Sequence, residues 1–280
     1  MENQSQSAPE IIGGAPLYRR PEPLNPKDHG NLGLLRHEVA YAFAAGQHFV
    51  PLLITEFGPA ACSYPIIFAG EDRAPIAVMG LKPGENVFAP EAINRGEAYN
   101  PAYLRRYPFI VASSSDPTNT AAVVCIDRDS DIVGENSAQP FFENGQFTPY
   151  AEQCVTFCQS YENERMMTIG ALARMKELDL FEFRTVSFTP TDATGQPLPP
   201  VEVASFHAIS MEKLNALPVE TYIQLRDQGI VTAIMAHWIS QSQWDRVVAR
   251  AMRRDEAAAA ANIGPDSAEL ARKAPAKKSK

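Results

Sequence analysis

The sequence has no long apolar run. No stretch of about 18 or more consecutive apolar residues occurs along its 280 residues, so a membrane-spanning helix, and with it a permease, is not expected. The first residues, MENQSQSAPEIIGG, also lack the cationic start and the following apolar stretch of a secretory signal peptide. We therefore expect a soluble, cytoplasmic protein.

Cysteine is scarce, and basic residues are outnumbered. The four cysteines, Cys62, Cys125, Cys154 and Cys158, show no zinc-finger spacing, and the five histidines form no helical His-x-x-x-His pair. We therefore predict no metal and no cofactor. The 25 basic against 33 acidic residues give a net charge of −8, which repels phosphate backbones, so nucleic acid is not an expected partner.

Motifs of nucleotide and hydrolase chemistry are missing as well. No Gly-Lys-Ser/Thr loop, dinucleotide fingerprint or Gly-x-Ser-x-Gly elbow is present, and the run 113–117 (SSSDP) has the composition of a turn. Cys154 and Cys158 lie four apart on a predicted helix, where a redox pair is conceivable. Their alternation with Phe157 and Tyr161 favours a buried apolar face instead. The sequence therefore names no reaction.

The pattern of apolar runs predicts an α+β fold, with a strand-rich N-terminal half packed with a helix-rich C-terminal half that contains a β-hairpin. Short apolar runs rich in β-branched or aromatic residues predict strands over 40–44, 49–54, 64–69, 75–81, 108–112 and 121–126. Short helices are expected over 57–61 and after Asn100, which can cap a helix with Pro101 in its first turn.

Helical signals dominate from Thr148 onwards. Thr148 and Pro149 form a start signal, because the hydroxyl can cap a helix whose first turn accepts proline. The apolar face that follows is interrupted over 162–165 and then resumes to Leu178, which indicates either one long helix or two in tandem. Turn residues over 191–196 join two β-like runs into the predicted hairpin. Further helices are expected over 211–217, 218–229 and from 230 to about 259.

Composition divides the chain into three parts. Residues 1–24 are rich in Ser, Gln, Pro and Gly and are predicted to form a flexible arm. Residues 25–254 are predicted to form a single folded domain. Residues 255–280 hold an Ala-rich helix end and a basic tail, for which a flexible, solvated state is expected.

The most unusual segment is 99–109, YNPAYLRRYPF, which holds three tyrosines, two arginines and two prolines. Tyr and Arg are enriched at binding hot spots, so Tyr103, Arg105, Arg106 and Tyr107 are candidate binding residues. The alternative is a short helix with core tyrosines whose arginines pair with acidic residues. The candidate acids, each next to a predicted strand end where acid–base chemistry is often built, are Glu56, Glu85 and Asp127.

Several of these pieces resemble the SapC family of bacterial proteins. The resemblance covers about residues 25–250 and is carried, in order, by 50–52 (VPL), 64–70 (YPIIFAG), 84–88 (GENVF), 103–109 (YLRRYPF), 125–127 (CID) and 148–150 (TPY), with a weaker echo at His237. The family is named after a locus tied to a surface-layer protein, and members occur near outer-membrane receptor and halogenase-like genes. The resemblance implies no reaction and no catalytic set.

Two hypotheses follow. The first is a SapC-like accessory or binding protein, linked to surface-layer or outer-membrane receptor systems, that holds a protein partner or a small ligand. The alternative is an enzyme, or a partner protein of an oxygenase or halogenase, with a carboxylate-lined site. The full set of candidate site residues is Tyr103, Arg105, Arg106, Tyr107, Glu56, Glu85, Asn86, Asp127 and His237.

Overall fold

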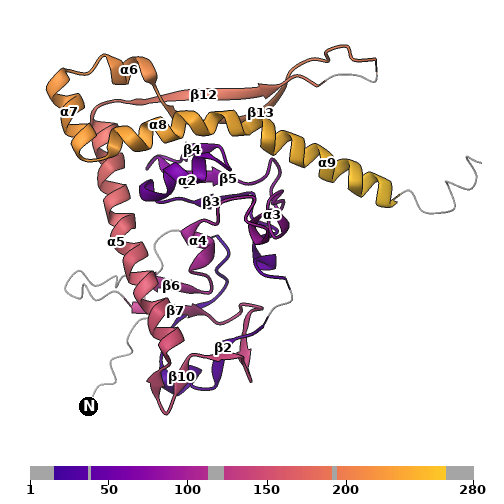
Figure 1. The fold of residues 1–280 in the computed structure, drawn as a ribbon, viewed down its shortest axis with the longest axis vertical. Coiled ribbons are helices and arrows are strands. Elements are labelled where there is room, and N and C mark those ends of the chain that lie inside the picture. The colour runs from indigo at the N-terminus through magenta and orange to yellow at the C-terminus, as the bar shows by residue number, and fades with distance from the viewer. Residues whose placement is uncertain (1–15, 37–38, 113–122, 191–193, 263–280) are drawn as a thin grey trace, which may run out of the picture.

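The computed structural model of the chain describes residues 16–36, 39–112, 123–190 and 194–262, and it confirms the predicted α+β class. Figure 1 shows one long helix, α5 (Pro149–Glu177), running along a flank of the molecule. Small sheets lie near the beginning of α5, and the larger sheet lies near its end. Among the described residues, no helix is both long enough and apolar enough to cross a membrane.

The larger sheet joins the two halves of the chain. It has five antiparallel strands in the order β12-β13-β4-β5-β3, in which β12 and β13 form the predicted hairpin. Their bounds are Phe49–Pro51 for β3, Ile66–Ala69 for β4, Ala74–Val78 for β5, Phe181–Phe188 for β12 and Val201–Ile209 for β13. A strand pair from the helix-rich half therefore extends a sheet that the strand-rich half begins.

The smaller sheets form the other end of the molecule (Figure 1). Three strands pair in the order β1-β7-β6, three more in the order β8-β2-β9, and β10 pairs with β11. Their bounds are Pro21–Pro23 (β1), Leu32–Leu34 (β2), Phe109–Ala112 (β6), Val123–Asp127 (β7), Val133–Glu135 (β8), Gln139–Pro140 (β9), Phe142–Glu143 (β10) and Gln146–Phe147 (β11). Gly33 allows β2 and β9 to approach closely, since a Cβ there would lie 2.3 Å from the Gln139 carbonyl oxygen.

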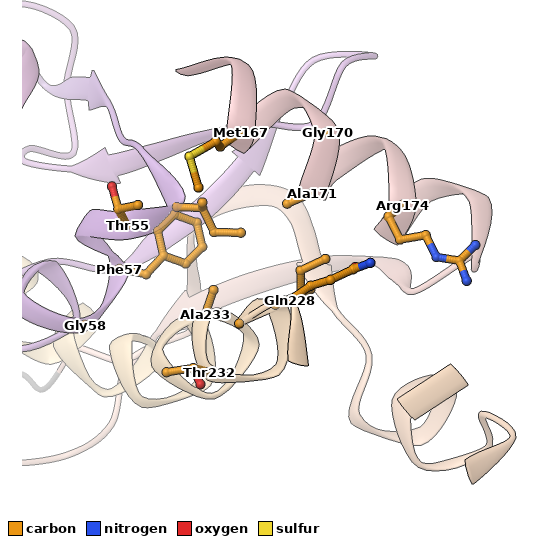
Figure 2. Close-up of a pocket in the computed structure, with 13 residues that line it drawn as sticks. Thr55, Phe57, Gly58, Met167, Gly170, Ala171, Arg174, Gln228, Thr232 and Ala233 are labelled. Carbon is orange, nitrogen blue, oxygen red and sulfur yellow. The ribbon is translucent and has the colours of Figure 1, made fainter. Parts of the chain in front are cut away.

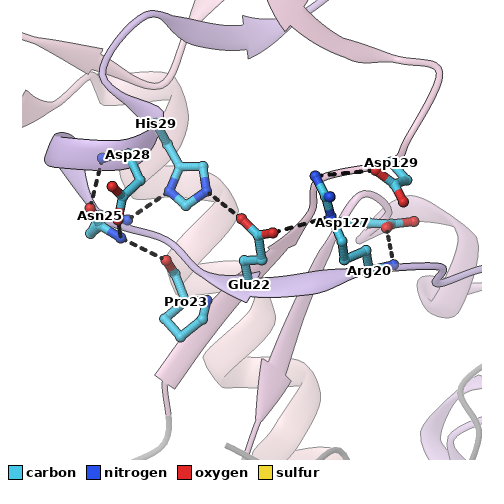
Figure 3. Close-up of polar contacts among 8 residues, drawn as sticks. All are labelled: Arg20, Glu22, Pro23, Asn25, Asp28, His29, Asp127 and Asp129. Carbon is cyan, nitrogen blue, oxygen red and sulfur yellow. Dashed lines mark hydrogen bonds and ion pairs between the residues drawn. The ribbon is translucent and has the colours of Figure 1, made fainter. Parts of the chain in front are cut away.

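The described part of the predicted N-terminal arm is packed against this end. Strand β1 pairs with β7, and the buried carboxylate of Asp127 accepts hydrogen bonds from the backbone N–H groups of Arg19 (3.2 Å) and Arg20 (2.8 Å). Figure 3 shows the contact of Asp127 with Arg20 and the polar contacts beyond it, in which Glu22 lies 3.1 Å from Arg20 and 3.4 Å from the buried His29. Residues 1–15 lie outside the described residues.

Helix α5 is one continuous helix, which decides between the two alternatives left open by the sequence. Thr148 caps it as predicted, because its Oγ1 accepts a hydrogen bond from the Ala151 N–H at 3.2 Å. The other helices are α1 (Pro26–His29), α2 (Phe57–Ala61), α3 (Glu91–Asn94), α4 (Ala102–Arg105), α6 (Met211–Asn215), α7 (Val219–Asp227), α8 (Ile230–Ser240) and α9 (Trp244–Asn262).

Three local predictions are wrong. The run 40–44 is not a strand, because Tyr41 has φ of 59° and a 3₁₀-helix, η1 (Ala42–Ala44), follows it. The helix predicted from residue 230 to about 259 is divided into α8 and α9 by a 3₁₀-turn, η3 (Gln241–Gln243). Asn100 does not cap α4, because the helix begins at Ala102 and Pro101, expected in its first turn, occupies the N-cap position without a side-chain hydrogen bond. The described helix α9 ends at Asn262, and the basic tail lies beyond the described residues.

Candidate functional site

Helix α4 is set in place by a buried carboxylate. Glu56, in the 3₁₀-helix η2 (Ile54–Glu56), accepts hydrogen bonds from the N–H groups of Ala102 (2.6 Å) and Leu53 (3.0 Å) and from the hydroxyl of Tyr99 (2.9 Å). The Ala102 N–H is an orphan donor of the first turn of α4, and a carboxylate there is also favoured by the helix dipole. Glu56 therefore orients the helix that ends at the two arginines.

Arg106 follows directly after α4 and lies inside a cage of tyrosines. Its side chain is buried, with 7% of the residue exposed. The guanidinium carbon lies 4.1 Å from the ring centre of Tyr161, 4.6 Å from that of Tyr103 and 5.6 Å from that of Tyr18. Each such cation–π contact is worth about 0.5–2 kcal/mol, depending on how far water is excluded. The cage therefore offsets part of the cost of burying the charge.

The charge of Arg106 has no counter-charge. Its Nε has no hydrogen-bond partner, and no carboxylate of the described residues forms an ion pair with it or with Arg105. The predicted pairing of these arginines with Glu56, Glu85 or Asp127 is therefore wrong. Glu56 is unavailable because it is engaged by α4, and Asp127 is engaged by the N-terminal segment. An unpaired buried charge normally costs several kcal/mol.

The groups around the guanidinium are neutral near pH 7. Burial raises the pKa of Tyr161 to about 12 and raises the pKa values of Tyr18 and Tyr103 above their usual range. Burial also raises the pKa of the Cys158 thiol to about 12 and that of Cys154 above its ordinary value. Neither cysteine is poised as a thiolate, and no tyrosinate balances the charge of Arg106.

Both arginines line one cavity of about 300 Å³, which we call the arginine pocket. Arg105, which is exposed, lies with its guanidinium carbon 5.2 Å from the ring centre of Phe157 and donates from Nε to the Asn100 carbonyl oxygen at 3.2 Å. The walls come from the end of α4, the start of β6 and the first third of α5. The residues that line the pocket are Arg105, Arg106, Tyr107, Phe109, Tyr150, Gln153, Cys154 and Phe157.

Two other candidates of the segment hold the pocket in place. The hydroxyl of Tyr107 donates to Asp127 at 3.2 Å, and its ring lies 4.5 Å from that of Phe43. The Tyr103 hydroxyl donates to the Pro16 carbonyl oxygen. Asp127 therefore supports the pocket through Tyr107 and through the N-terminal segment that carries Tyr18. The structure brings these candidates together in a shared architecture, although Asp127 does not line the cavity.

Glu85 and Asn86 lie elsewhere, in the turn after β5. Asn86 is a structural clamp, because its Oδ1 accepts from the N–H groups of Phe88 and Ala89, both at 2.9 Å, and its Nδ2 donates to the Ala44 carbonyl oxygen at 3.1 Å. Glu85 is nearly buried, and its Oε1 lies 3.9 Å from Nε of Arg254 in α9. These two residues take no part in the arginine pocket.

His237 lies at a seam inside the larger sheet. Strands β13 and β4 share a single register pair, His207 with Phe68. His237, on α8, bridges them: its Nε2 accepts from the Ile209 N–H at 3.2 Å, and its Nδ1 contacts the Ile66 carbonyl oxygen at 2.9 Å. Because Nε2 accepts, the neutral ring must carry its hydrogen on Nδ1 and donate it. Burial lowers the pKa of His237 to about 4, so the ring is neutral at pH 7.

Side chains of α8, with Gln241 at the start of η3, complete the seam. Ser240 Oγ accepts from the Ile66 N–H at 3.0 Å, Gln241 Nε2 donates to the Ile66 carbonyl oxygen at 2.8 Å, and Trp238 Nε1 donates to the Ile209 carbonyl oxygen at 2.8 Å. Side chains of α8 and η3 thus replace ladder hydrogen bonds between two strands. His237 has a structural role that fully accounts for its burial.

A larger apolar cavity of about 740 Å³ lies between η2, α2, α5 and the start of α8 (Figure 2). Figure 2 shows Phe57, Met167 and Ala233 facing it, with Arg174 at its edge. Arg174 is paired with Glu177 at 2.7 Å, so this cavity lacks the unpaired charge that distinguishes the arginine pocket. Met167, which lines this cavity and is 62% exposed on α5, was not expected from the sequence to be a cavity residue.

No metal centre is found in the part of the chain that the structure describes, where no group of three or more His, Cys, Asp or Glu side chains could hold an ion. Part of the arginine pocket was not expected from the sequence. The face of α5 that carries Tyr150, Cys154, Phe157 and Tyr161 was assigned to the core. The burial of Tyr161 confirms this for that residue, whereas Tyr150, Cys154 and Phe157 are partly buried and also line the pocket. Tyr18 was missed because it lies in the segment predicted to be a flexible arm.

The fold and this geometry define an α+β protein with a small cavity lined by two arginines, neither of which forms an ion pair with a carboxylate of the described residues. The model of the SapC family matches residues 24–247, and the chain belongs to the SapC family. No curated protein and no solved structure gives a significant match to it.

Proposed function

We propose that this chain is a binding protein that holds an anionic group in the arginine pocket. The observation that carries the proposal is Arg106, a residue that lines the cavity and whose buried guanidinium has no carboxylate partner among the described residues. An anion placed there would form charge-assisted hydrogen bonds, each worth about 1.5–3 kcal/mol, and would supply the missing counter-charge. The exposed guanidinium of Arg105 adds a second cation to the same cavity.

The chemistry of the lining favours binding over catalysis. The pocket offers cations and aromatic faces. Burial raises the pKa values of its other titratable groups, Tyr107, Tyr150 and Cys154, so none of them is ionised as a general base near pH 7. Glu56 and His237 each have complete sets of structural partners elsewhere. No observation in the described residues favours the enzyme hypothesis with its carboxylate-lined site.

We also propose a cellular compartment and a biological context for the protein. Four free cysteines among the described residues suit a reducing cytoplasm. Family membership supports an accessory role, and we place that role with the surface-layer or outer-membrane receptor systems that the family name implies. The partner would then present or deliver the anionic ligand, or carry the anionic group itself.

Cysteine protection tests the proposal directly. Cys154 lines the arginine pocket, whereas the exposed Cys62, at the end of α2, does not and serves as an internal control. The protein is labelled with N-ethylmaleimide at constant ionic strength in the presence of phosphate, sulfate or monocarboxylates of increasing length, and each site is followed by peptide mass spectrometry. We expect anions to slow labelling at Cys154 and leave Cys62 unchanged. Equal labelling of Cys154 with and without every anion would refute the proposal.

A further inference from the structure

A second cavity adjoins the arginine pocket. It has a volume of about 260 Å³ and shares Arg105, Tyr107 and Tyr150 with the arginine pocket. The remaining walls are mostly apolar and include Leu34, Leu35, Ala42, Phe43, Leu104 and Ile132. We call this cavity the apolar slot. Three shared residues place the two cavities side by side, with Arg105 at their boundary.

The linings of the two cavities differ in chemistry, and together they match the two ends of a single ligand. The arginine pocket is lined by two arginines that have no carboxylate partner among the described residues, and the slot has aliphatic and aromatic walls. We infer that the ligand is an amphipathic monocarboxylate, with its carboxylate at Arg105 and Arg106 and its apolar body in the slot. This inference rests on the proposed function and specifies the ligand class for the same site.

A carboxylate suits the polar end because a planar guanidinium matches its two oxygens in a bidentate geometry. The slot limits the apolar end: 260 Å³ is the share of roughly nine water molecules at about 30 Å³ each, which is room for a short chain or one ring. A single small cavity, lined in part by Phe43 and Ile132, fits a free small molecule better than a folded protein surface. Ligands of this size commonly occupy mostly apolar pockets with few polar groups.

The Cys154 protection assay and isothermal titration calorimetry measure the effect of chain length. The ligand series is acetate, butyrate, hexanoate and octanoate, with octan-1-ol and octylamine as charge controls. Burial of a methylene contributes about 0.8 kcal/mol, so affinity should rise about fourfold for each added methylene until the slot is full. The alcohol and the amine should give no protection of Cys154.

A slot variant locates the apolar end. Ala42 lines the slot and is exposed, so Ala42→Trp should fill the slot without disturbing the core. Ala257→Trp, on the exposed face of α9, is the matched control. We expect Ala42→Trp to abolish the gain from acetate to octanoate, and Ala257→Trp to retain it.

The outcomes separate the inference from the proposed function. If acetate protects Cys154 as well as octanoate does, the anion site stands and the amphipathic ligand is refuted. Equal binding of octan-1-ol and octanoate, or a chain-length gain that persists in Ala42→Trp, also overturns the inference. If no anion of any length protects Cys154, the proposed function itself fails.

Discussion

Two buried polar side chains, His237 and Arg106, show opposite solutions to the same physical problem. His237 is completely buried, is neutral at pH 7 and has a partner for each ring nitrogen. Arg106 is almost as deeply buried but stays charged, and its Nε has no partner. The arrangement at His237 has a structural explanation, because both ring nitrogens have hydrogen-bond partners.

The arrangement at Arg106 leaves a buried positive charge for which the described residues supply no counter-charge. Tyrosine faces around Arg106 are attractive to a cation, but they are neutral and bring no counter-charge. Buried polar groups in proteins are almost always satisfied, and exceptions often mark a site where a ligand binds. Incomplete partners alone do not mark a site, since His29 Nε2, Glu85 Oε2 and Asn100 Oδ1 also lack them. Arg106 is distinguished because it combines a buried charge, an unpartnered atom and a place in the lining of the arginine pocket.

The largest effect on the free energy of unfolding is expected at Glu56. Its buried carboxylate, like the ring of His237, has a complete set of hydrogen-bond partners. Glu56→Ala leaves three donors without their acceptor, those of Leu53, Tyr99 and Ala102. We expect the free energy of unfolding to fall by about 3–5 kcal/mol in urea denaturation. The exposed Glu256→Ala in α9 should change it by less than about 0.5 kcal/mol. A loss for Glu56→Ala as small as the control would show that the cap of α4 is dispensable.

The next effect is the pH dependence that His237 gives to stability. Its pKa of about 4 in the folded state lies below the value near 6.5 of an unfolded histidine, so the unfolded chain takes up the proton first. Stability from this group is complete above about pH 6.5 and falls by about 3 kcal/mol as the pH drops to 4. Urea denaturation between pH 7.5 and 4 measures it.

The variant His237→Gln isolates this contribution. Glutamine does not titrate but can still donate to Ile66 and accept from Ile209, so the variant should lose that part of the slope between pH 6.5 and 4. Other acidic groups titrate equally in both proteins and cancel in the difference. Parallel curves for the two proteins would contradict a depressed pKa at His237.

A smaller and opposite effect is expected at Arg106. Replacement of an unpaired buried charge by an apolar residue of similar length removes a desolvation cost and also removes the cation–π contacts. We expect Arg106→Met to leave the free energy of unfolding unchanged or to raise it by about 1 kcal/mol, while anions no longer protect Cys154. A destabilisation above about 2 kcal/mol would show that Arg106 stabilises the fold as His237 does. The contrast between the two side chains would then not hold.

The smallest effect on stability is expected at Arg105, which is exposed at the boundary of the two cavities. Arg105→Gln should change the free energy of unfolding by less than about 0.5 kcal/mol. It should weaken carboxylate binding about fivefold, since loss of one hydrogen bond to a charge in a partly solvated site costs about 1 kcal/mol. Calorimetry with octanoate measures the affinity, and unchanged binding would restrict the anion contact to Arg106.

Local signals predicted those parts of the fold that depend on near neighbours. Thr148 and Pro149 predicted the start of α5, and turn residues between two β-like runs predicted the hairpin of β12 and β13. The run 40–44 was mistaken for a strand because five apolar residues fit either a strand or a 3₁₀-turn. The division between α8 and α9 was missed because Ser240 and Gln241 bond to Ile66, a contact between distant parts of the chain.

The candidate site was predicted in composition but not in arrangement. The segment 99–109 supplies both arginines and Tyr103 and Tyr107, as the sequence indicated. The partners of those arginines were predicted wrongly, because the cap of α4 by Glu56 and the contact of Tyr18 with Arg106 join segments far apart in the sequence. Hydrogen bonds of this kind are decided by topology, which a single sequence does not display.

The seam at His237 also bears on the order in which the protein assembles. Until Gln241 has left the ribosome, the edge of β4 has no helix to satisfy Ile66, and the hairpin of β12 and β13 has little to hold it against that edge. A nascent chain therefore carries an open strand edge through most of its synthesis, which is a liability for aggregation. The last third of the chain closes the sheet, so truncation before α8 should yield an insoluble product.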